Sequence, residues 1–314
     1  MVFVVVCGLL FFAFVIVNWN VRRTNAYKNF YRAIHVVKDV SPTNKYDYGA
    51  FGSTFAYYAY DLKGFNGHNF SIEPQSVAYM KKTIDNFICN VEKGGVALIS
   101  LAGCFFAASS TNADEACTTY YSFLKPAEFN HFRMAVKIKY YLKRYFPALS
   151  PVYIKRLIKD EPLKYSKKNG ISYEKGVEEA KRRIRGWERV VGKAISEKFE
   201  SDAALDAVLD GNIELMRKII YTVREYGVVP VFVVLPMSKA FNDCCPRVFY
   251  EKILYRCLNK LENENVLVLD YLYDEDLCLM DNYLTSDCLN VNGRKKLTNR
   301  IIKDLNDSLV TKAS

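Results

Sequence analysis

Apolar residues along the chain alternate between continuous runs and amphipathic spacing. The continuous runs predict buried strands at 45–51, 65–70, 96–101, 228–235 and 266–270. The fourth of these strands is the most hydrophobic. The amphipathic spacing predicts helices between and after them, at 75–89, 210–226, 249–262 and 292–309. Because strands that alternate with helices form parallel βαβ units, the pattern predicts an α/β fold, a three-layer α/β/α doubly wound parallel sheet.

The first residues form an uncharged apolar run. Residues 2–17 carry no charge, and Trp19 follows at the position of an interfacial anchor. Since a spanning helix needs about 17 residues or more, we expect an uncleaved transmembrane anchor at 1–20 and a juxtamembrane helix within 21–44. A buried first helix is the alternative. The positive-inside rule alone would put the main domain in the cytoplasm, because the basic residues follow the span: Arg22, Arg23, Lys28 and Arg32.

A basic helical section interrupts the α/β pattern at 126–205, inside a domain predicted over 45–314. Its last helix is predicted over 173–199. Alternating charge signs on this helix are typical of a solvated face, and the alternative is a basic cap over an anionic substrate or membrane. The formal net charge of +10 favours anionic partners without choosing among them. The basic residues of this helix are Lys181, Arg182, Arg183, Arg185 and Arg189.

The nine cysteines and the absence of common site motifs argue against several classes of functional site. No two cysteines are spaced CxxC, which argues against a zinc ribbon or a thioredoxin-type site. The odd total and the adjacent Cys244 and Cys245 are typical of reduced, mostly buried thiols, and a bridge between Cys104 and Cys117 stays open. No GxGxxG, GxxxxGK or HExxH motif is present. We expect neither a cofactor nor a metal.

A serine follows the first predicted strand. Residues 48–60 read YGAFGSTFAYYAY, and Gly52 permits a turn that would present Ser53 at the carboxyl end of the strand. Open α/β sheets bind their ligands at that end, so Ser53 is a candidate nucleophile. Capping of the next helix is the alternative role, because serine is a preferred N-cap residue.

Five stretches carry a resemblance to a known family: YGAFGSTFAYYAYD, GFNGHNFSIEPQS, YYSFLKP, VVPVFVVLPMSKAFND and SDCLNVNGRKKLT. From residue 46 onward the chain resembles the SGNH/GDSL hydrolase superfamily. It resembles most closely the membrane-anchored branch found with bacterial cell-envelope polysaccharide genes, and more distantly the D-alanyl-lipoteichoic acid biosynthesis proteins. The resemblance implies an esterase or acyltransferase fold on the extracytoplasmic side, against the charge rule. It also implies two partners, the membrane and an anionic or acylated polysaccharide.

The same resemblance implies the catalytic positions. The family's nucleophile falls on Ser53, and its last block supplies a histidine base with an aspartate three residues earlier. Here Cys288 stands at the base position and Thr285 at the acid position, with Asp287 adjacent to Cys288. A serine without a base in reach is a poor nucleophile, and a thiol accepts a proton poorly.

The oxyanion positions also depart from the family pattern. The second block normally offers a glycine N–H, and here the turn ends in Pro74, which has no N–H. The third block normally offers an asparagine, and here the strand runs into Gly103 and Cys104. Loss of one oxyanion donor costs about 10²-fold or more in rate, and loss of a triad member costs several orders of magnitude.

These departures predict a catalytically impaired protein, a pseudoenzyme that binds or formerly modified acylated polysaccharide. The alternative is an active serine esterase or O-acyltransferase on cell-envelope glycans, with His68 or Asp287 as a rearranged base. His35 and His131 are weaker candidates for that role. Nucleic-acid binding rests on net charge alone, and without a recognition motif we expect no nucleic-acid partner.

Overall fold

The computed structural model describes residues 1–109, 112–160 and 163–313 of the chain. They form two compact units. Met1–Val40 with Glu115–Ser166 is called the helical unit here, and Ser41–Asp114 with Lys167–Ser314 the sheet unit. The predicted insertion at 126–205 is therefore divided, since its first part lies in the helical unit and its second part in the sheet unit.

Five parallel strands form the sheet, in the order β2-β1-β3-β4-β5. Their bounds are Tyr46–Phe51 (β1), Gly67–Asn69 (β2), Val91–Leu101 (β3), Val229–Val234 (β4) and Leu267–Asp270 (β5). This is a doubly wound order, in which the direction of winding reverses between β1 and β3, and ligands bind outside the carboxyl ends of the strands at such a reversal. The predicted α/β class and parallel sheet are confirmed.

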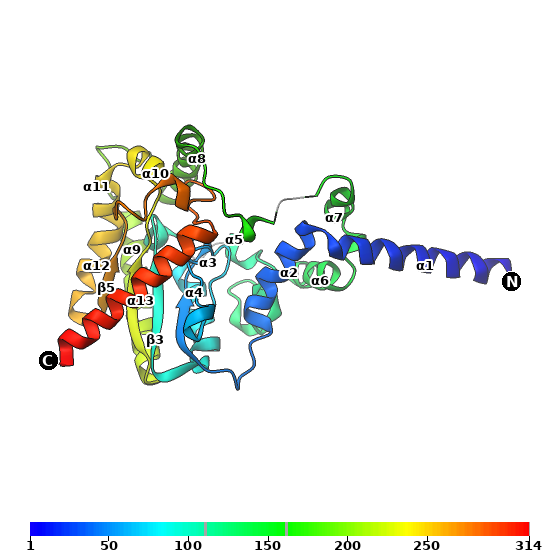
Figure 1. The fold of residues 1–314 in the computed structure, drawn as a ribbon, viewed down its shortest axis with the longest axis horizontal. Helices are drawn as coiled ribbons and strands as arrows, with labels where there is room; N and C mark the ends of the chain where they lie inside the picture. Colours follow the sequence, from blue (N-terminus) through cyan, green and yellow to red (C-terminus); the bar gives the residue numbers. More distant parts are fainter. Residues whose placement is uncertain (110–111, 161–162, 314) are drawn as a thin grey trace. The chain divides into compact units, whose positions relative to one another are not determined.

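Helices connect and cover the strands of the sheet unit. Their bounds are Thr54–Tyr57 (α3), Val77–Phe87 (α4), Tyr173–Val191 (α8), Ala203–Glu225 (α9), Lys239–Cys244 (α10), Arg247–Tyr250 (α11), Arg256–Lys260 (α12) and Val291–Ala313 (α13). A π-helical turn, Glu251–Tyr255, joins α11 to α12. Because parallel strands are joined by right-handed crossovers, α4, α9 and α12 share one face, where α9 contacts both neighbours. The last helix, α13, crosses the sheet in Figure 1.

The core of the sheet unit is strongly aromatic, as the 20 phenylalanines and 23 tyrosines of the sequence suggest. Phe51 of β1 stacks on Phe70 at a ring distance of 5.1 Å, and Phe70 stacks on Phe87 of α4 at 5.4 Å. The apolar side chains of β4 after Val229, which is exposed, are buried as well. Burial of this apolar surface is what fixes the strands predicted from the continuous apolar runs.

Helix α8 ends earlier than the sequence pattern predicts, and this is a correction to the range 173–199. Gly192 adopts a left-handed conformation (φ +74°) and stops the helix after Val191. The chain then turns back to α9, whose N-cap residue Asp202 accepts a hydrogen bond from the backbone N–H of Leu205 (2.9 Å).

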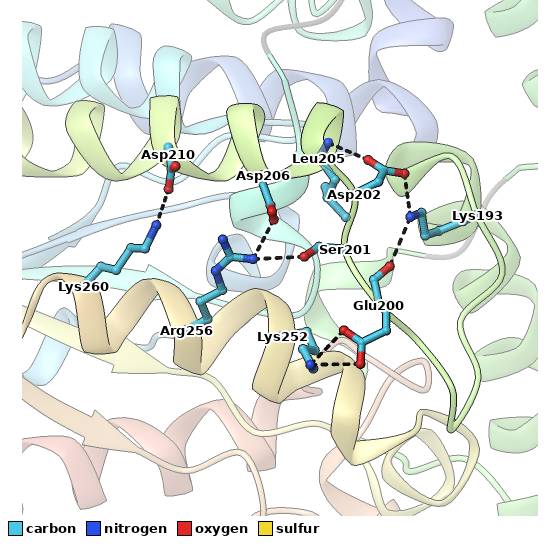
Figure 2. A network of polar contacts seen from close by, with 10 residues as sticks. All are labelled: Lys193, Glu200, Ser201, Asp202, Leu205, Asp206, Asp210, Lys252, Arg256 and Lys260. Atoms are coloured by element: carbon cyan, nitrogen blue, oxygen red, sulfur yellow. Dashed lines mark hydrogen bonds and ion pairs between the residues drawn. The ribbon is translucent and has the colours of Figure 1, made fainter.

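A network of ion pairs holds the segment between α8 and α9 (Figure 2). Lys193, just after α8, pairs with Asp202 (2.5 Å). Lys252 pairs with Glu200 (2.8 Å) from the helix on the other side of the segment. Further pairs link α12 to α9 along their length, Arg256 with Asp206 (2.6 Å) and Lys260 with Asp210 (2.5 Å). The network fixes the path of the chain from the carboxyl end of α8 to α9.

The helical unit begins with α1 (Val2–Arg23), which is long and apolar enough to cross a membrane. Most of its apolar side chains are exposed, so α1 is not a buried core helix of this unit. The remaining helices are α2 (Asn25–Lys38), α6 (Met134–Tyr145) and α7 (Pro151–Ile154), and the short α5 (Asn112–Glu115) lies where the chain passes between units. A small core joins α1, α2 and α7, made of Val21, Ala26, Ala148 and Tyr153 with Phe14 and Phe30 packed against it.

Candidate functional site

Ser53 lies where the chain leaves β1, between the sheet and α3. Gly52 allows β1 to approach β3 closely, since a Cβ at Gly52 would come within 2.6 Å of the Ala56 Cβ and 2.9 Å of the Ser100 Cβ. Ser53 occupies the N-cap position of α3, but its side chain makes no capping hydrogen bond. Among the described residues its half-buried hydroxyl has no hydrogen-bond partner, so the capping role does not occupy it.

The loop after β2 runs beside this turn. The Phe70 N–H donates to the Ala50 carbonyl (2.7 Å), and the Ile72 N–H donates to the Gly52 carbonyl (3.1 Å). The chain thus follows β1 past the end of β2, which brings the turn that ends in Pro74 to the neighbourhood of Ser53. Pro74 itself is exposed and, as an imide, offers no donor there.

The third block is covered by a tryptophan from α8. Gly103 follows β3 with a left-handed backbone (φ +45°), and a Cβ there would lie 2.1 Å from the Trp187 Cη2 atom. The Trp187 ring is buried and stacks on Phe249 at a ring distance of 5.7 Å. Helix α8 therefore packs directly over the carboxyl end of β3.

The last block forms a tight turn before α13. The Leu284 N–H donates to the Cys288 carbonyl (2.8 Å), which closes the turn. Within it the Thr285 hydroxyl donates to the Asp287 carboxylate (2.9 Å). The hydroxyl of Ser238, the N-cap residue of α10, donates to the Ser286 carbonyl (2.6 Å) and ties the turn to the start of α10.

Arg183 of α8 forms an ion pair with Asp287 through its Nε atom. The Asp287 side chain is 2% exposed, and the Arg183 side chain is 43% exposed. The same guanidinium lies 5.9 Å from the centre of the Phe55 ring, two residues after Ser53. It also interacts electrostatically with Cys288 and Cys104. Arg183 is thus the residue on which the first, third and last blocks converge.

Cys288 cannot take over the role of a base. Burial, and next the Asp287 charge, raise the pKa of the Cys288 thiol well above its usual value. Burial likewise raises the pKa of Cys104 to about 12. Both groups are therefore neutral thiols at physiological pH, a form that is neither a proton acceptor nor a nucleophile. All nine cysteines, Cys117 included, are free in the structure.

His68 lies along the body of the sheet. It pairs in register with Gly49 of β1, four residues before Ser53, a separation of about 13 Å along an extended strand. Its ring stacks on Tyr46 (5.1 Å) and contacts Phe70 (4.6 Å). No hydrogen bond between a histidine and Ser53 occurs in the described part of the chain. His35 and His131 belong to the helical unit.

A polar pocket of about 290 Å³ opens beside Asp287, between α8 and the turn before α13. Its lining holds three guanidinium groups and two carboxylates, so its formal charge is positive. A shallow groove next to it shares Arg189 and runs along the end of α8 to Lys193. The pocket is lined by Glu179, Arg182, Arg183, Gly186, Arg189, Thr285, Ser286 and Asp287.

Sequence reasoning named Arg183 only among the basic residues of the helix predicted over 173–199, and it did not identify Trp187 or Glu179. All three share one face of α8 because they are four residues apart, and Glu179 also accepts a hydrogen bond from the Ser286 N–H (3.2 Å). That spacing was the available signal. It distinguished one face of the helix from the others, but it did not indicate what this face contacts.

Comparison of the chain with protein-family models and with curated proteins gives no match. The fold and the geometry at the end of the sheet are therefore what any functional assignment must rest on.

Proposed function

We propose that the chain is a membrane-anchored SGNH-like protein of the bacterial cell envelope that binds an anionic polysaccharide and has lost efficient ester cleavage. The doubly wound strand order supports the fold assignment. The fold assignment is also supported by the arrangement of four features around one end of the sheet: Ser53, the turn after β2, Gly103 and the 285–288 turn. The apolar helix α1 supports the anchor.

One observation carries the loss of activity: Asp287 is engaged by Arg183, and the base position beside it is a buried, neutral thiol. In a serine hydrolase the base removes the hydroxyl proton while a carboxylate orients that base. Here the carboxylate neutralises an arginine, and the Ser53 hydroxyl has no hydrogen-bonded base among the described residues. None of the described residues is therefore placed to raise the nucleophilicity of Ser53.

The arginine-lined pocket supports the binding role. Guanidinium groups recognise carboxylates and phosphates through paired hydrogen bonds. Arg183 is already paired with Asp287, whereas Arg182 and Arg189 line the pocket without an ion pair in the described part of the chain. The groove that continues from Arg189 suits an extended chain better than a small compact ligand.

Activity is tested with a fluorophosphonate probe and a chromogenic acetate ester, on the full chain and on Ser53→Ala. We expect no labelling of Ser53 and turnover that differs less than twofold between the two proteins. Labelling that disappears in Ser53→Ala would instead establish the alternative, an active serine esterase or O-acyltransferase. The position of Ser53 at the turn after β1, where its side chain makes no capping hydrogen bond, is the observation that favours that alternative.

Binding is tested with polygalacturonate as a carboxylated chain and dextran as a neutral one, by calorimetry. Removal of both unpaired arginines, Arg182→Ala/Arg189→Ala, should weaken polygalacturonate binding about tenfold or more. The control Lys218→Ala/Lys295→Ala removes the same charge from exposed positions on α9 and α13. Equal losses of polygalacturonate affinity in both variants would show that only net charge matters. That result would contradict the proposed binding site.

A further inference from the structure

Helix α6 exposes an apolar stripe on its surface. Its exposed large apolar residues recur at intervals of three and four and are each 41% to 60% exposed: Met134, Ile138, Tyr141, Leu142 and Tyr145. The stripe continues into the following turns, where Ile158 is 92% exposed. Its further members are Phe146, Leu149, Val152, Ile154 and Leu157. We call residues 134–158 the apolar platform.

The apolar platform is fixed to the end of the candidate membrane span. The Asn18 side chain donates to the Tyr145 carbonyl (3.2 Å) and accepts from the Ala148 N–H (3.1 Å). Arg22 also donates to the Tyr145 carbonyl (2.7 Å). About one turn before Asn18, the Phe14 ring lies 6.3 Å from the Phe146 ring.

These contacts place the platform at a particular depth. The continuous apolar run of α1 ends at Val17, and the polar residues that bind the platform begin with Asn18. If α1 crosses a membrane, residues 18–22 lie at its surface, where Trp19 is a typical anchor. The apolar side chains of the platform then border the boundary between headgroups and acyl chains, the level at which amphipathic helices bind.

The charged residues within the platform sequence have one sign. From Phe129 to Lys159 the sequence has eight lysines and arginines and no acidic residue. Three of the lysines, Lys139, Lys155 and Lys159, are exposed. Basic residues next to an apolar face favour anionic lipid headgroups. A two-fold dimer through this face would set each basic cluster against its copy, which argues against a second chain as the occupant.

We propose that the apolar platform lies in the interface of a membrane that contains anionic lipid, beside the span of α1. The helical unit is then held by two elements, one crossing the bilayer and one lying on it. This inference does not depend on the proposed function of the sheet unit.

Photocrosslinking tests the depth of the platform. Benzoylphenylalanine replaces Ile138 or Ile158 in the full chain, reconstituted in nanodiscs of equal parts phosphatidylglycerol and phosphatidylcholine. We expect lipid adducts at both positions and none at Tyr221, the control, which is 65% exposed on α9. Because α1 retains every variant in the disc, absence of adducts at 138 and 158 would overturn the proposal. Crosslinks to a second copy or to another protein at these positions would overturn it too.

A second measurement tests the preference for anionic lipid. In Lys139→Gln/Lys155→Gln/Lys159→Gln, the ratio of phosphatidylglycerol to phosphatidylcholine adducts should fall from about fivefold or more to about one. The control Lys218→Gln/Lys295→Gln/Lys303→Gln removes three exposed charges from the sheet unit and should retain the original ratio. An unchanged ratio in the first variant would refute the anionic-lipid assignment.

Discussion

Arg183 and Asp287 are joined in an ion pair whose two partners differ in exposure, with the carboxylate almost fully buried and the guanidinium side chain 43% exposed. The carboxylate also accepts a hydrogen bond from the Thr285 hydroxyl. The pair therefore connects α8 to the turn before α13 and supplies the charge that a buried carboxylate requires. Both the stability of the turn and the chemistry of the site depend on it.

Removal of Arg183 should destabilise the sheet unit. Arg183→Ala leaves the buried Asp287 carboxylate with the Thr285 hydroxyl but without a cation. Exposed pairs contribute about 0–1 kcal/mol, and loss of one partner of a buried pair costs about 3–5 kcal/mol. For this half-exposed pair we expect a loss of about 2 kcal/mol in the free energy of unfolding, measured by urea titration. Adding Asp287→Asn should recover part of it, and strict additivity of the two changes would show that the residues are not coupled.

Gly52 should not tolerate a side chain. In Gly52→Ala the new methyl would meet the Ala56 and Ser100 Cβ atoms at 2.6 and 2.9 Å, so β1 and β3 must separate. Overpacking of this kind costs about 1–3 kcal/mol. At Gly211, in the middle of α9, an added methyl group would have no neighbouring atom within 4 Å. Gly211→Ala should therefore stabilise the fold by about 0.5–1 kcal/mol. Thermal unfolding should show a lower midpoint for Gly52→Ala and a higher midpoint for Gly211→Ala than for the unchanged chain.

Ser238 should contribute more than an ordinary helix cap. Its side chain accepts from the Phe241 N–H at the start of α10 and donates to the Ser286 carbonyl, and it is fully buried. Ser238→Ala loses both bonds and should cost about 2 kcal/mol. Ser172 caps α8 at an exposed position, so Ser172→Ala loses a cap only and should cost about 1 kcal/mol or less. Equal losses in urea titrations would mean that the bond to Ser286 contributes nothing.

Stability should fall in alkaline solution. Burial raises the pKa of Cys104 from 9.0 to about 12, so the folded state keeps a proton that the unfolded state releases. The stabilisation is complete below pH 9 and is lost as the pH rises from about 9 to about 12. Over that window each such thiol contributes a slope of about 1.4 kcal/mol per pH unit. Cys104→Ala should reduce the slope by that amount in reducing buffer, whatever it does to stability at pH 8.

The strands and their parallel order could be predicted because burial in a parallel sheet requires continuous apolar runs, and 228–235 is such a run. The end of α8 was harder to predict from the sequence. A glycine stops a helix only where the chain can turn, and the charged residues after Gly192 still had helical spacing. The apolar character of residues 2–17 likewise predicted α1.

The site was predictable in part. Residues 53, 74, 103 and 288 follow strand ends or enter the last helix, and parallel topology brings such positions to one edge of a sheet. The role of Arg183 was not predictable, because it depends on how α8 crosses that edge. The distance of His68 from Ser53 was not predictable either. His68 lies in a short strand, and only the register with Gly49 shows how far it is from Ser53.

The position of Trp187 makes the site observable without a label. The sequence contains two tryptophans, and the other, Trp19, is in α1. In a Trp19→Phe variant, the intrinsic fluorescence would come from the ring that covers Gly103 and lies one helical turn from Arg183. Its emission would then report directly on any ligand or rearrangement at the end of β3.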